Sequence, residues 1–187
     1  SKGPGKTFTL AMLGWHFFMT NYRPKMAALS VTKDHLKSNL WAELLMWRER
    51  SDLCKLSTND GAERITLKGH EGYSFIDARS FPKSADANQQ ASALAGLHAD
   101  NVAFLIDEAG TIPDAILATA DAALAGGNDG NKNAKLIVTA NPEVPSGLLY
   151  RASVGKTVQK WAIQRVSGDP DDPKRAPKVN INWAREQ

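Results

Sequence analysis

Apolar and polar positions alternate along the chain in blocks that predict helices and strands in turn. A strongly apolar stretch at 8–19 predicts a helix that is buried against a sheet. A short apolar run at 26–32 has the length of a strand. Apolar residues at helical spacing from 36 to 47 predict the next helix, which Thr32 or Asp34 is expected to cap. Strands and helices in alternation are typical of a parallel α/β sheet.

Two continuous apolar runs later in the chain, at 102–106 and 136–140, predict fully buried strands of the same sheet. Helices are predicted at 87–97, which is rich in Ala and Gln, and at 113–124, which begins with a proline. The segment 126–133 is rich in Gly and Asn and predicts a surface loop. The second half of the chain therefore continues the α/β pattern.

A different pattern stands between these two halves. Short apolar runs at 65–67 and 73–76 flank a glycine-containing segment at 68–72, which predicts a hairpin or two short antiparallel strands. The sequence thus predicts an α/β domain with a mainly parallel central sheet flanked by helices and a small antiparallel hairpin insertion.

The bulk composition fits one globular domain. The chain has 187 residues, of which 42% are hydrophobic and 23% are charged, and its net charge is +3. We assign 1–167 to this domain and 168–187, which is rich in proline and in charges of both signs, to a linker. From 151 onward, eight Lys and Arg residues stand against four Asp and Glu. That excess suits either a polyanion such as nucleic acid or an ordinary solvated surface.

The positions of the cysteine and the histidines argue against a disulfide and a zinc site. Cys54 is the only cysteine, so no intrachain disulfide forms and a reducing compartment is expected. His35, His70 and His98 show no metal-ligand spacing with Cys54, which argues against a zinc site, and His16 is expected in the core or at its edge. No apolar run approaches the roughly 20 residues of a membrane span, so we expect no membrane association.

The first residues carry a phosphate-binding pattern, the P-loop G-x-x-x-x-G-K-[ST]. All of it except its first glycine is supplied by Ser1, Lys2, Gly3, Pro4, Gly5, Lys6 and Thr7. The missing glycine would precede the first residue, so we expect the chain to be part of a longer protein. The alternative interpretation is a Gly/Pro turn ahead of an ordinary helix.

The chemistry of this motif is specific. Gly3 and Gly5 let backbone N–H groups approach the phosphates, and the following helix directs its positive end toward them. Lys6 is expected to reach the β- and γ-phosphates, and Thr7 is expected to bind Mg²⁺ through its hydroxyl. The motif therefore predicts a site for ATP and Mg²⁺.

An acidic pair, Asp107 and Glu108, follows the predicted strand at 102–106. In a P-loop enzyme the first carboxylate binds Mg²⁺, and the second orients and deprotonates the attacking water. The position is suitable because ligands of open α/β sheets bind at the carboxyl ends of strands. A solvated turn is the alternative.

Two further polar residues complete the predicted catalytic set with Lys6 and Glu108. Asn141 follows the predicted strand at 136–140, where an amide can contact the γ-phosphate and report its hydrolysis. Lys2 can neutralise charge on the transferring phosphoryl group, as arginine fingers do. The alternatives are a strand-ending Asn-Pro turn and a solvent-facing lysine.

These motifs, in this order, resemble the ATPase domain of the large terminase subunits of tailed bacteriophages, the motors that pump DNA into procapsids. The similarity covers nearly the whole chain and includes a coupling motif and a following Gly-aromatic turn. Its more specific part is the ordered set with Leu40-Trp41-Ala42-Glu43 and Ala140-Asn141-Pro142. Beyond the P-loop and the acidic pair, it rests on Ser30-Val31-Thr32, Leu40-Trp41-Ala42-Glu43-Leu44, Gly96-Leu97-His98-Ala99-Asp100-Asn101, Thr139-Ala140-Asn141-Pro142 and Ser146-Gly147-Leu148-Leu149-Tyr150.

The resemblance implies a P-loop NTPase fold of the ASCE type that hydrolyses ATP with Mg²⁺ and translocates double-stranded DNA. It implies that Lys2 takes the role of the family's early basic residue and that Asn141 couples hydrolysis to DNA movement. The implied partners are a portal protein, a small terminase subunit and further copies of the chain in a ring, in the cytoplasm of an infected or lysogenic bacterial host. The family continues into an RNase H-like nuclease, toward which 168–187 would lead. No matching carboxylate set is present, so no nuclease activity is expected of this chain.

Two other functions stay open at the level of sequence. One is a helicase-like or DNA-repair ATPase on the same fold, although the motifs of a second ATPase-like domain are missing from the sequence. The other is a nucleotide-gated DNA-binding or assembly module without turnover. Glu108 argues against this module because a protein that only binds nucleotide needs no general base.

Overall fold

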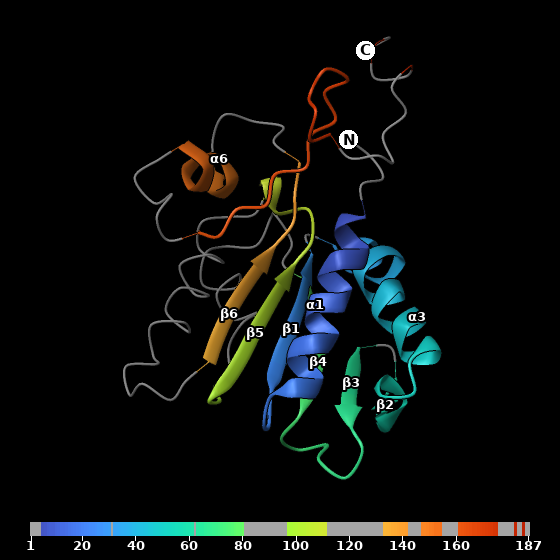
Figure 1. Cartoon of the computed structure of the whole chain (residues 1–187). Coiled ribbons are helices and arrows are strands. Elements are labelled where there is room, and N and C mark those ends of the chain that lie inside the picture. The colour runs from blue at the N-terminus through green and yellow to red at the C-terminus, as the bar shows by residue number, and fades with distance from the viewer. Residues whose placement is uncertain are drawn as a thin grey trace.

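Six strands form one mixed, mostly parallel sheet flanked by helices in the computed structural model (Figure 1). The structure describes residues 5–30, 32–61, 63–80, 97–111, 133–141, 147–154 and 161–175, together with 182 and 185. The predicted α/β class with a mainly parallel sheet is thereby confirmed.

The strand order across the sheet is β2-β3-β4-β1-β5-β6. Strands β4, β1, β5 and β6 are parallel, whereas β3 is antiparallel to both β2 and β4. The strands are β1 (Lys25–Ser30), β2 (Ser57–Asn59), β3 (Arg64–Leu67), β4 (Phe75–Ser80), β5 (Asn101–Ile106) and β6 (Asn133–Val138).

The helices of the described residues fall into two long helical paths and several short pieces. The first path is α1 (Lys6–Thr20). The second runs without a break through α2 (Lys33–Leu36), the π-helical turn η1 (Lys37–Trp41) and α3 (Ala42–Arg50). The short pieces are η2 (Cys54–Leu56), η3 (Ala109–Thr111) and α6 (Gly147–Val154). Of the two predicted caps, Thr32 is the one used, because its side chain accepts the backbone N–H of His35.

Both long helical paths cover the same face of the sheet, and alternate side chains of the central strands point toward them. Met26 and Ala28 of β1 and Leu105 of β5 point into a core shared with α1, α3 and the turn between α2 and α3. The intervening residues, such as Leu29 and Phe104, enter a second core on the opposite face. Strands β1 and β5 are thus buried on both faces, which explains their continuous apolar runs.

Several predicted elements differ in detail from the observed ones. The antiparallel pair is confirmed by the register Ile65↔Ile76, but β4 also pairs in parallel with β1, so it belongs to the main sheet and not to an insertion. Strand β6 ends at Val138 and is only half-buried, so its prediction as a fully buried strand to residue 140 is wrong. Its edge position explains this, since no described strand pairs with its second side.

Other predictions concern the segments around these strands. The segment from Gly147 forms a helix where the resemblance implied a turn. Residues 87–96, 113–124 and 126–132 lie outside the described residues, and so do their predicted helices and loop. Asn133, expected in that loop, is the first residue of β6. Within 161–175, turns and irregular backbone agree with the predicted irregular tail.

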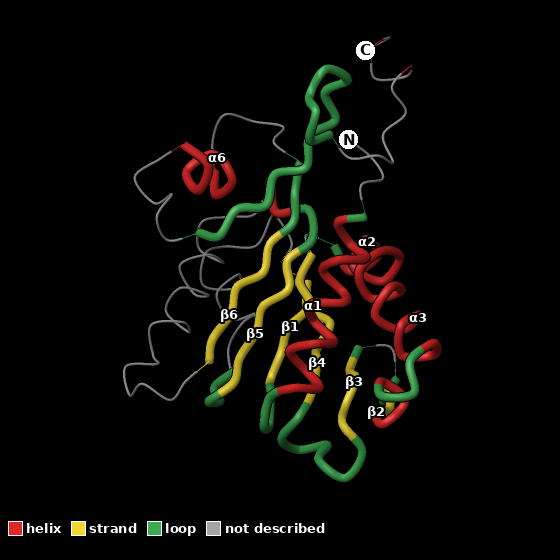
Figure 2. The backbone as a smooth tube through the Cα atoms, in the orientation of Figure 1, coloured by secondary structure: helices red, strands yellow, loops and turns green. Residues whose placement is uncertain are grey.

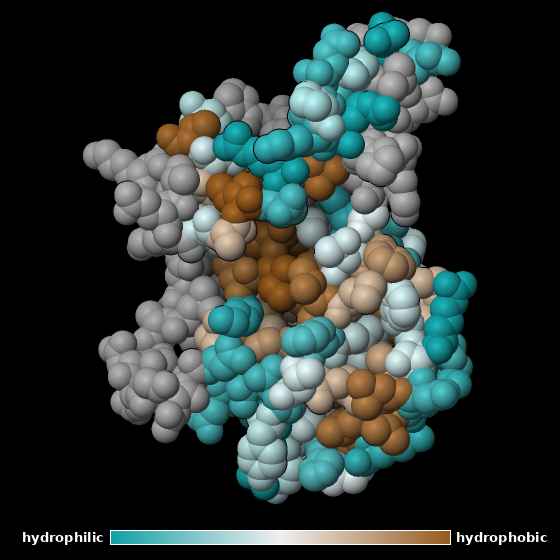
Figure 3. Space-filling view, in the orientation of Figure 1, coloured by the Kyte–Doolittle hydropathy of each residue, from teal (hydrophilic) through white to brown (hydrophobic). Residues whose placement is uncertain are grey.

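The surface over β5 and β6, beside α1, is apolar on the face shown in Figure 3. Leu13 of α1 is 46% exposed, and Ile137 of β6 is only partly buried against the core. No helix within the described part of the chain combines the length and the apolar character needed to cross a bilayer.

Asp77, on β4, is expected to contribute measurably to the free energy of unfolding. It is buried, Arg64 of β3 donates to both of its oxygens at 2.6 and 2.9 Å, and Arg79 donates at 2.9 Å. Removing the carboxylate leaves two guanidinium groups without this acceptor. We therefore expect Asp77→Ala to lower the free energy of unfolding by about 1–3 kcal/mol, measured by urea denaturation.

The matched control is Asp52→Ala, which removes a carboxylate paired with Lys55 on the exposed surface. Surface ion pairs contribute little, so this variant should unfold close to the unaltered chain. Equal decreases in the free energy of unfolding of the two variants would show that the buried ion pairs of Asp77 stabilise the fold no more than a surface ion pair does.

Candidate functional site

The predicted functional residues that the structure describes meet at one edge of the sheet. The carboxyl ends of β1, β5 and β6 lie at this edge, and α1 begins there (Figure 2). The parallel register aligns Leu29 of β1 with Ile106 of β5 and Ile106 with Val138 of β6. Residues that follow these three strands therefore become neighbours, although they are far apart in the sequence.

The start of α1 has the features of an anion-binding helix end. Gly5 precedes it in the left-handed conformation, at φ 85°, which glycine adopts without a steric penalty. No side chain caps the helix, and its first turn contains no acidic residue. The first N–H groups of a helix have no partner within it and carry partial positive charge. This end of α1 can therefore receive a phosphate group.

Asp107 connects α1 to the ends of β5 and β6. Its Oδ2 accepts the Thr7 hydroxyl at 2.8 Å. Its Oδ1 accepts the Thr139 hydroxyl at 2.6 Å and the backbone N–H of Glu108 at 3.1 Å. The carboxylate is 3% exposed. One oxygen is thus held by the protein, and the other is directed at the first turn of α1.

This geometry fits a magnesium ion. Mg²⁺ prefers oxygen ligands in an octahedron, where neighbouring ligands at about 2.0–2.1 Å from the metal stand about 2.9 Å from each other. The 2.8 Å between Thr7 Oγ1 and Asp107 Oδ2 is close to that separation. Among the described residues, no three His, Cys, Asp or Glu side chains cluster as a metal site. A magnesium ion bound through one carboxylate, one hydroxyl and substrate phosphates needs no such cluster.

Lys6 and Asn141 are also brought together. The Lys6 ammonium donates a hydrogen bond to the Asn141 side-chain oxygen across the site. The Asn141 backbone also lies close to Gly110, where an added Cβ would come within 3.2 Å of the Asn141 backbone oxygen. The predicted phosphate-binding lysine and the predicted sensor therefore contact each other directly.

Glu108 sits beside this cluster in a strained backbone conformation. Its φ is 55°, in the left-handed region that residues other than glycine rarely adopt. The side chain is 60% exposed, and its Oε2 lies 3.2 Å from Nε2 of His35. An exposed carboxylate next to Asp107 is able to accept a proton from water.

Ser1, Lys2, Gly3 and Pro4 lie outside the described residues, so their predicted roles stay predictions. Three described residues of the site had no predicted role of their own: His35, Asn39 and Thr139. The sequence signal for Thr139 was its place two residues before Asn141. For His35 and Asn39 the sequence signal was weak, because only the placement of the helix that follows β1 brings them to the site.

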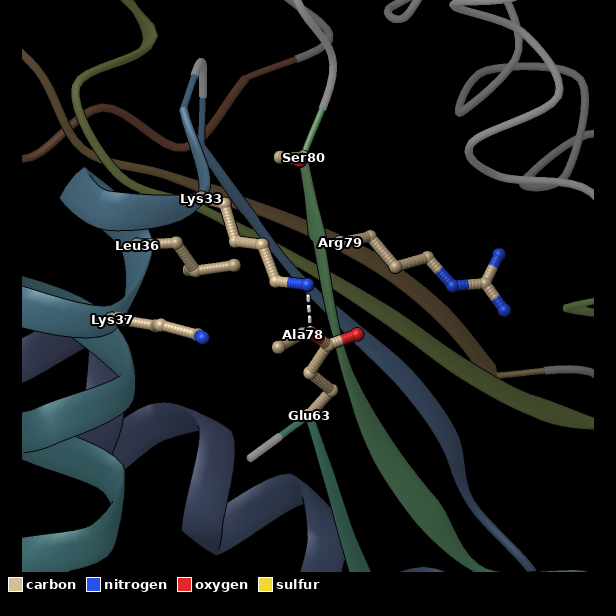
Figure 4. A pocket seen from close by; sticks show the side chains of 7 residues that line it. All are labelled: Lys33, Leu36, Lys37, Glu63, Ala78, Arg79 and Ser80. Atoms are coloured by element: carbon tan, nitrogen blue, oxygen red, sulfur yellow. Dashed lines mark ion pairs between the residues drawn. The ribbon is translucent and has the colours of Figure 1, made fainter. Parts of the chain in front are cut away.

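A cavity of about 340 Å³ lies near this edge but is separate from the cluster around Asp107 (Figure 4). The Lys33 ammonium there hydrogen-bonds Glu63 and holds the pKa of that carboxyl below its ordinary value. Arg79 points away from these two side chains and donates to Asp77. Neither Lys6 nor any other described residue of the Asp107 cluster lines the cavity, so the hydrogen-bond geometry and not the cavity locates the site.

We compared the chain with models of known protein families and with curated proteins. No family model and no curated protein matches it.

Proposed function

We propose that this chain is a Mg²⁺-dependent ATPase domain of the kind found in large terminase subunits, with a P-loop fold of the ASCE type. The contact between Thr7 and Asp107 carries the proposal. It joins the end of the phosphate-binding motif to the acidic pair across 100 residues of sequence. The adjacent contact between Lys6 and Asn141 supports the same assignment.

The residues have separate roles in the proposed reaction. The first turn of α1 and Lys6 bind the β- and γ-phosphates, and their positive charge offsets the charge of the transition state. Thr7 and Asp107 hold Mg²⁺, which when bound neutralises charge on the phosphate oxygens. Glu108 accepts a proton from the attacking water. Asn141, which shares Lys6 with the phosphate, changes its contacts when the γ-phosphate leaves.

The DNA-translocating part of the proposal depends on the motif order and its resemblance to large terminases. The partners in that case are double-stranded DNA, a portal protein, a small terminase subunit and further copies of the chain, in the cytoplasm of a bacterial host. The described stretch 161–175 adds no basic surface to this argument, because its three Lys and Arg residues are matched by three Asp residues.

Steady-state hydrolysis of Mg·ATP, with and without double-stranded DNA, tests the proposal. Because Lys6 makes charge-assisted contacts to phosphate, we expect Lys6→Ala to raise KM for ATP about tenfold or more. Lys55→Ala, in a surface ion pair on η2, is the control and should leave KM unchanged. DNA should raise turnover, and added salt should weaken that stimulation.

The outcomes separate the parts of the proposal. A Lys6→Ala chain that hydrolyses ATP like the unaltered one would rule out the assigned site. Turnover that requires Lys6 but does not respond to DNA would leave the ATPase in place and remove the translocation step.

A further inference from the structure

We propose that His35 is a positioning residue that holds the Glu108 carboxylate for proton transfer, an inference that rests on the proposed function. His35 lies on α2, which follows the end of β1, whereas Glu108 follows β5. Their side chains meet with His35 Nε2 3.2 Å from Glu108 Oε2. The predicted catalytic residues of the described part lie on α1 or after β5 and β6, so His35, which had no predicted role, adds a third strand end to the site.

His35 is itself firmly held. Thr32 caps α2 by accepting the backbone N–H of His35 at 3.2 Å. The imidazole Nδ1 lies 3.2 Å from the hydroxyl of Ser30, which is 2% exposed, and Nε2 lies 2.9 Å from the side-chain amide of Asn39. Ser30 and Asn39 thus contact the two ring nitrogens, and Thr32 holds the backbone of His35.

Donation to Glu108 requires one tautomer. With the proton on Nε2, the ring can donate to Glu108 Oε2, and Nδ1 accepts the Ser30 hydroxyl. The structure places Nδ2 of Asn39 at Nε2, so this tautomer also requires the Asn39 amide to turn its oxygen toward the ring, where it accepts from the same Nε2–H. The opposite tautomer would direct the lone pair of Nε2 at a carboxylate, which is repulsive. Positioning of Glu108 therefore depends on the Nε2-protonated ring.

Glu108 has a reason to need such a partner. Its side chain is mostly exposed and has several rotatable bonds, so an unheld carboxylate would sample many orientations. A hydrogen bond from His35 to Oε2, across the observed 3.2 Å contact, would leave Oε1 to accept the proton of the attacking water. A base that is oriented by a third group is a recurring arrangement in catalysis.

Three substitutions at one position test this role. His35→Ala removes the donor and should lower kcat about 10- to 100-fold, with KM for ATP changed less than about twofold, as for other residues that orient a reacting group. His35→Gln places an amide N–H near the position of Nε2 and should recover most of kcat. His35→Asn places its amide near Nδ1 and should not. His70→Ala, in the turn between β3 and β4, is the control.

A double-mutant cycle separates positioning from structural support. If His35 acts through Glu108, His35→Ala should have no further effect in a Glu108→Gln chain, measured in single-turnover experiments. The same loss in both backgrounds would overturn the proposal, and so would an unchanged kcat in His35→Ala. Failure of the proposed function looks different, because Glu108→Gln itself would then leave turnover unaffected.

The contact can also be tested without turnover. The chain has only four histidines, so their imidazole nitrogens can be resolved by ¹⁵N NMR. We expect His35 to carry its proton on Nε2, and we expect that resonance to shift in Glu108→Gln but not in Glu49→Gln. A His35 protonated on Nδ1 alone, or unaffected by the change at Glu108, would refute the inference whatever the enzymatic result.

Discussion

Replacing Glu108 by Gln is expected to lower kcat for ATP hydrolysis about 10²- to 10⁴-fold, the range of a lost general base. The amide has nearly the same shape as the carboxylate but cannot take a proton from water. The side chain is 60% exposed, so the change should not disturb the core. The amide oxygen can still accept from His35 Nε2. Nucleotide affinity should therefore stay within about twofold of the unaltered chain, because binding depends on Lys6 and the start of α1.

The measurement pairs steady-state turnover with equilibrium binding of a slowly hydrolysed ATP analogue. Glu49→Gln, an equal charge change on the exposed side of α3, serves as the control and should keep full activity. Loss of turnover with intact binding would support Glu108 as the base. Intact turnover would exclude that role, and loss of both properties would indicate that Glu108 acts through the fold of the site.

The sequence predicts the fold best where burial on both faces leaves a continuous apolar run. Strand β5 was predicted from such a run, and only its first residue, Asn101, was missed. Strand β6 was also predicted from an apolar run, of which 136–138 lie in the strand, but it is half-buried at the edge of the described sheet. Hydrophobicity reports that a segment can be buried, whereas its position in the sheet decides how far it is. The short strand β2 was not predicted, because three residues carry no periodic signal.

The candidate site was predictable by residue type but not by contact. The motifs indicate Lys6, Thr7, Asp107 and Asn141, and the structure brings these four together. Their distances follow from the parallel register of the strands, which no local pattern specifies. His35 shows the limit most clearly. Judged by metal-ligand spacing, it had no role, and only the adjacency of β1 and β5 places it against the acidic pair.

Asp107→Asn is the second change for which we expect a large effect. Asparagine has the size of aspartate, and its amide can still bond the two threonine hydroxyls, which donate or accept as required. The fold of this edge should therefore survive, whereas the negative charge that attracts Mg²⁺ is lost. We expect kcat/KM at about millimolar Mg²⁺ to fall about 100-fold or more. Loss of a residue that only supports a metal ligand costs about 10- to 100-fold, so loss of the ligand itself should cost at least as much.

The dependence of catalytic activity on Mg²⁺ concentration shows whether Asp107 binds the metal. If Asp107 binds the metal, excess Mg²⁺ should recover part of the activity of Asp107→Asn, because the weakened site is refilled by mass action. Asp100→Asn, an exposed change at the opposite end of β5, should show the Mg²⁺ dependence of the unaltered chain. If Asp107 serves only to bridge Thr7 and Thr139, its asparagine variant should also keep that dependence. The position of the Mg²⁺ titration curve, more than the size of the loss, therefore distinguishes a metal ligand from a structural carboxylate.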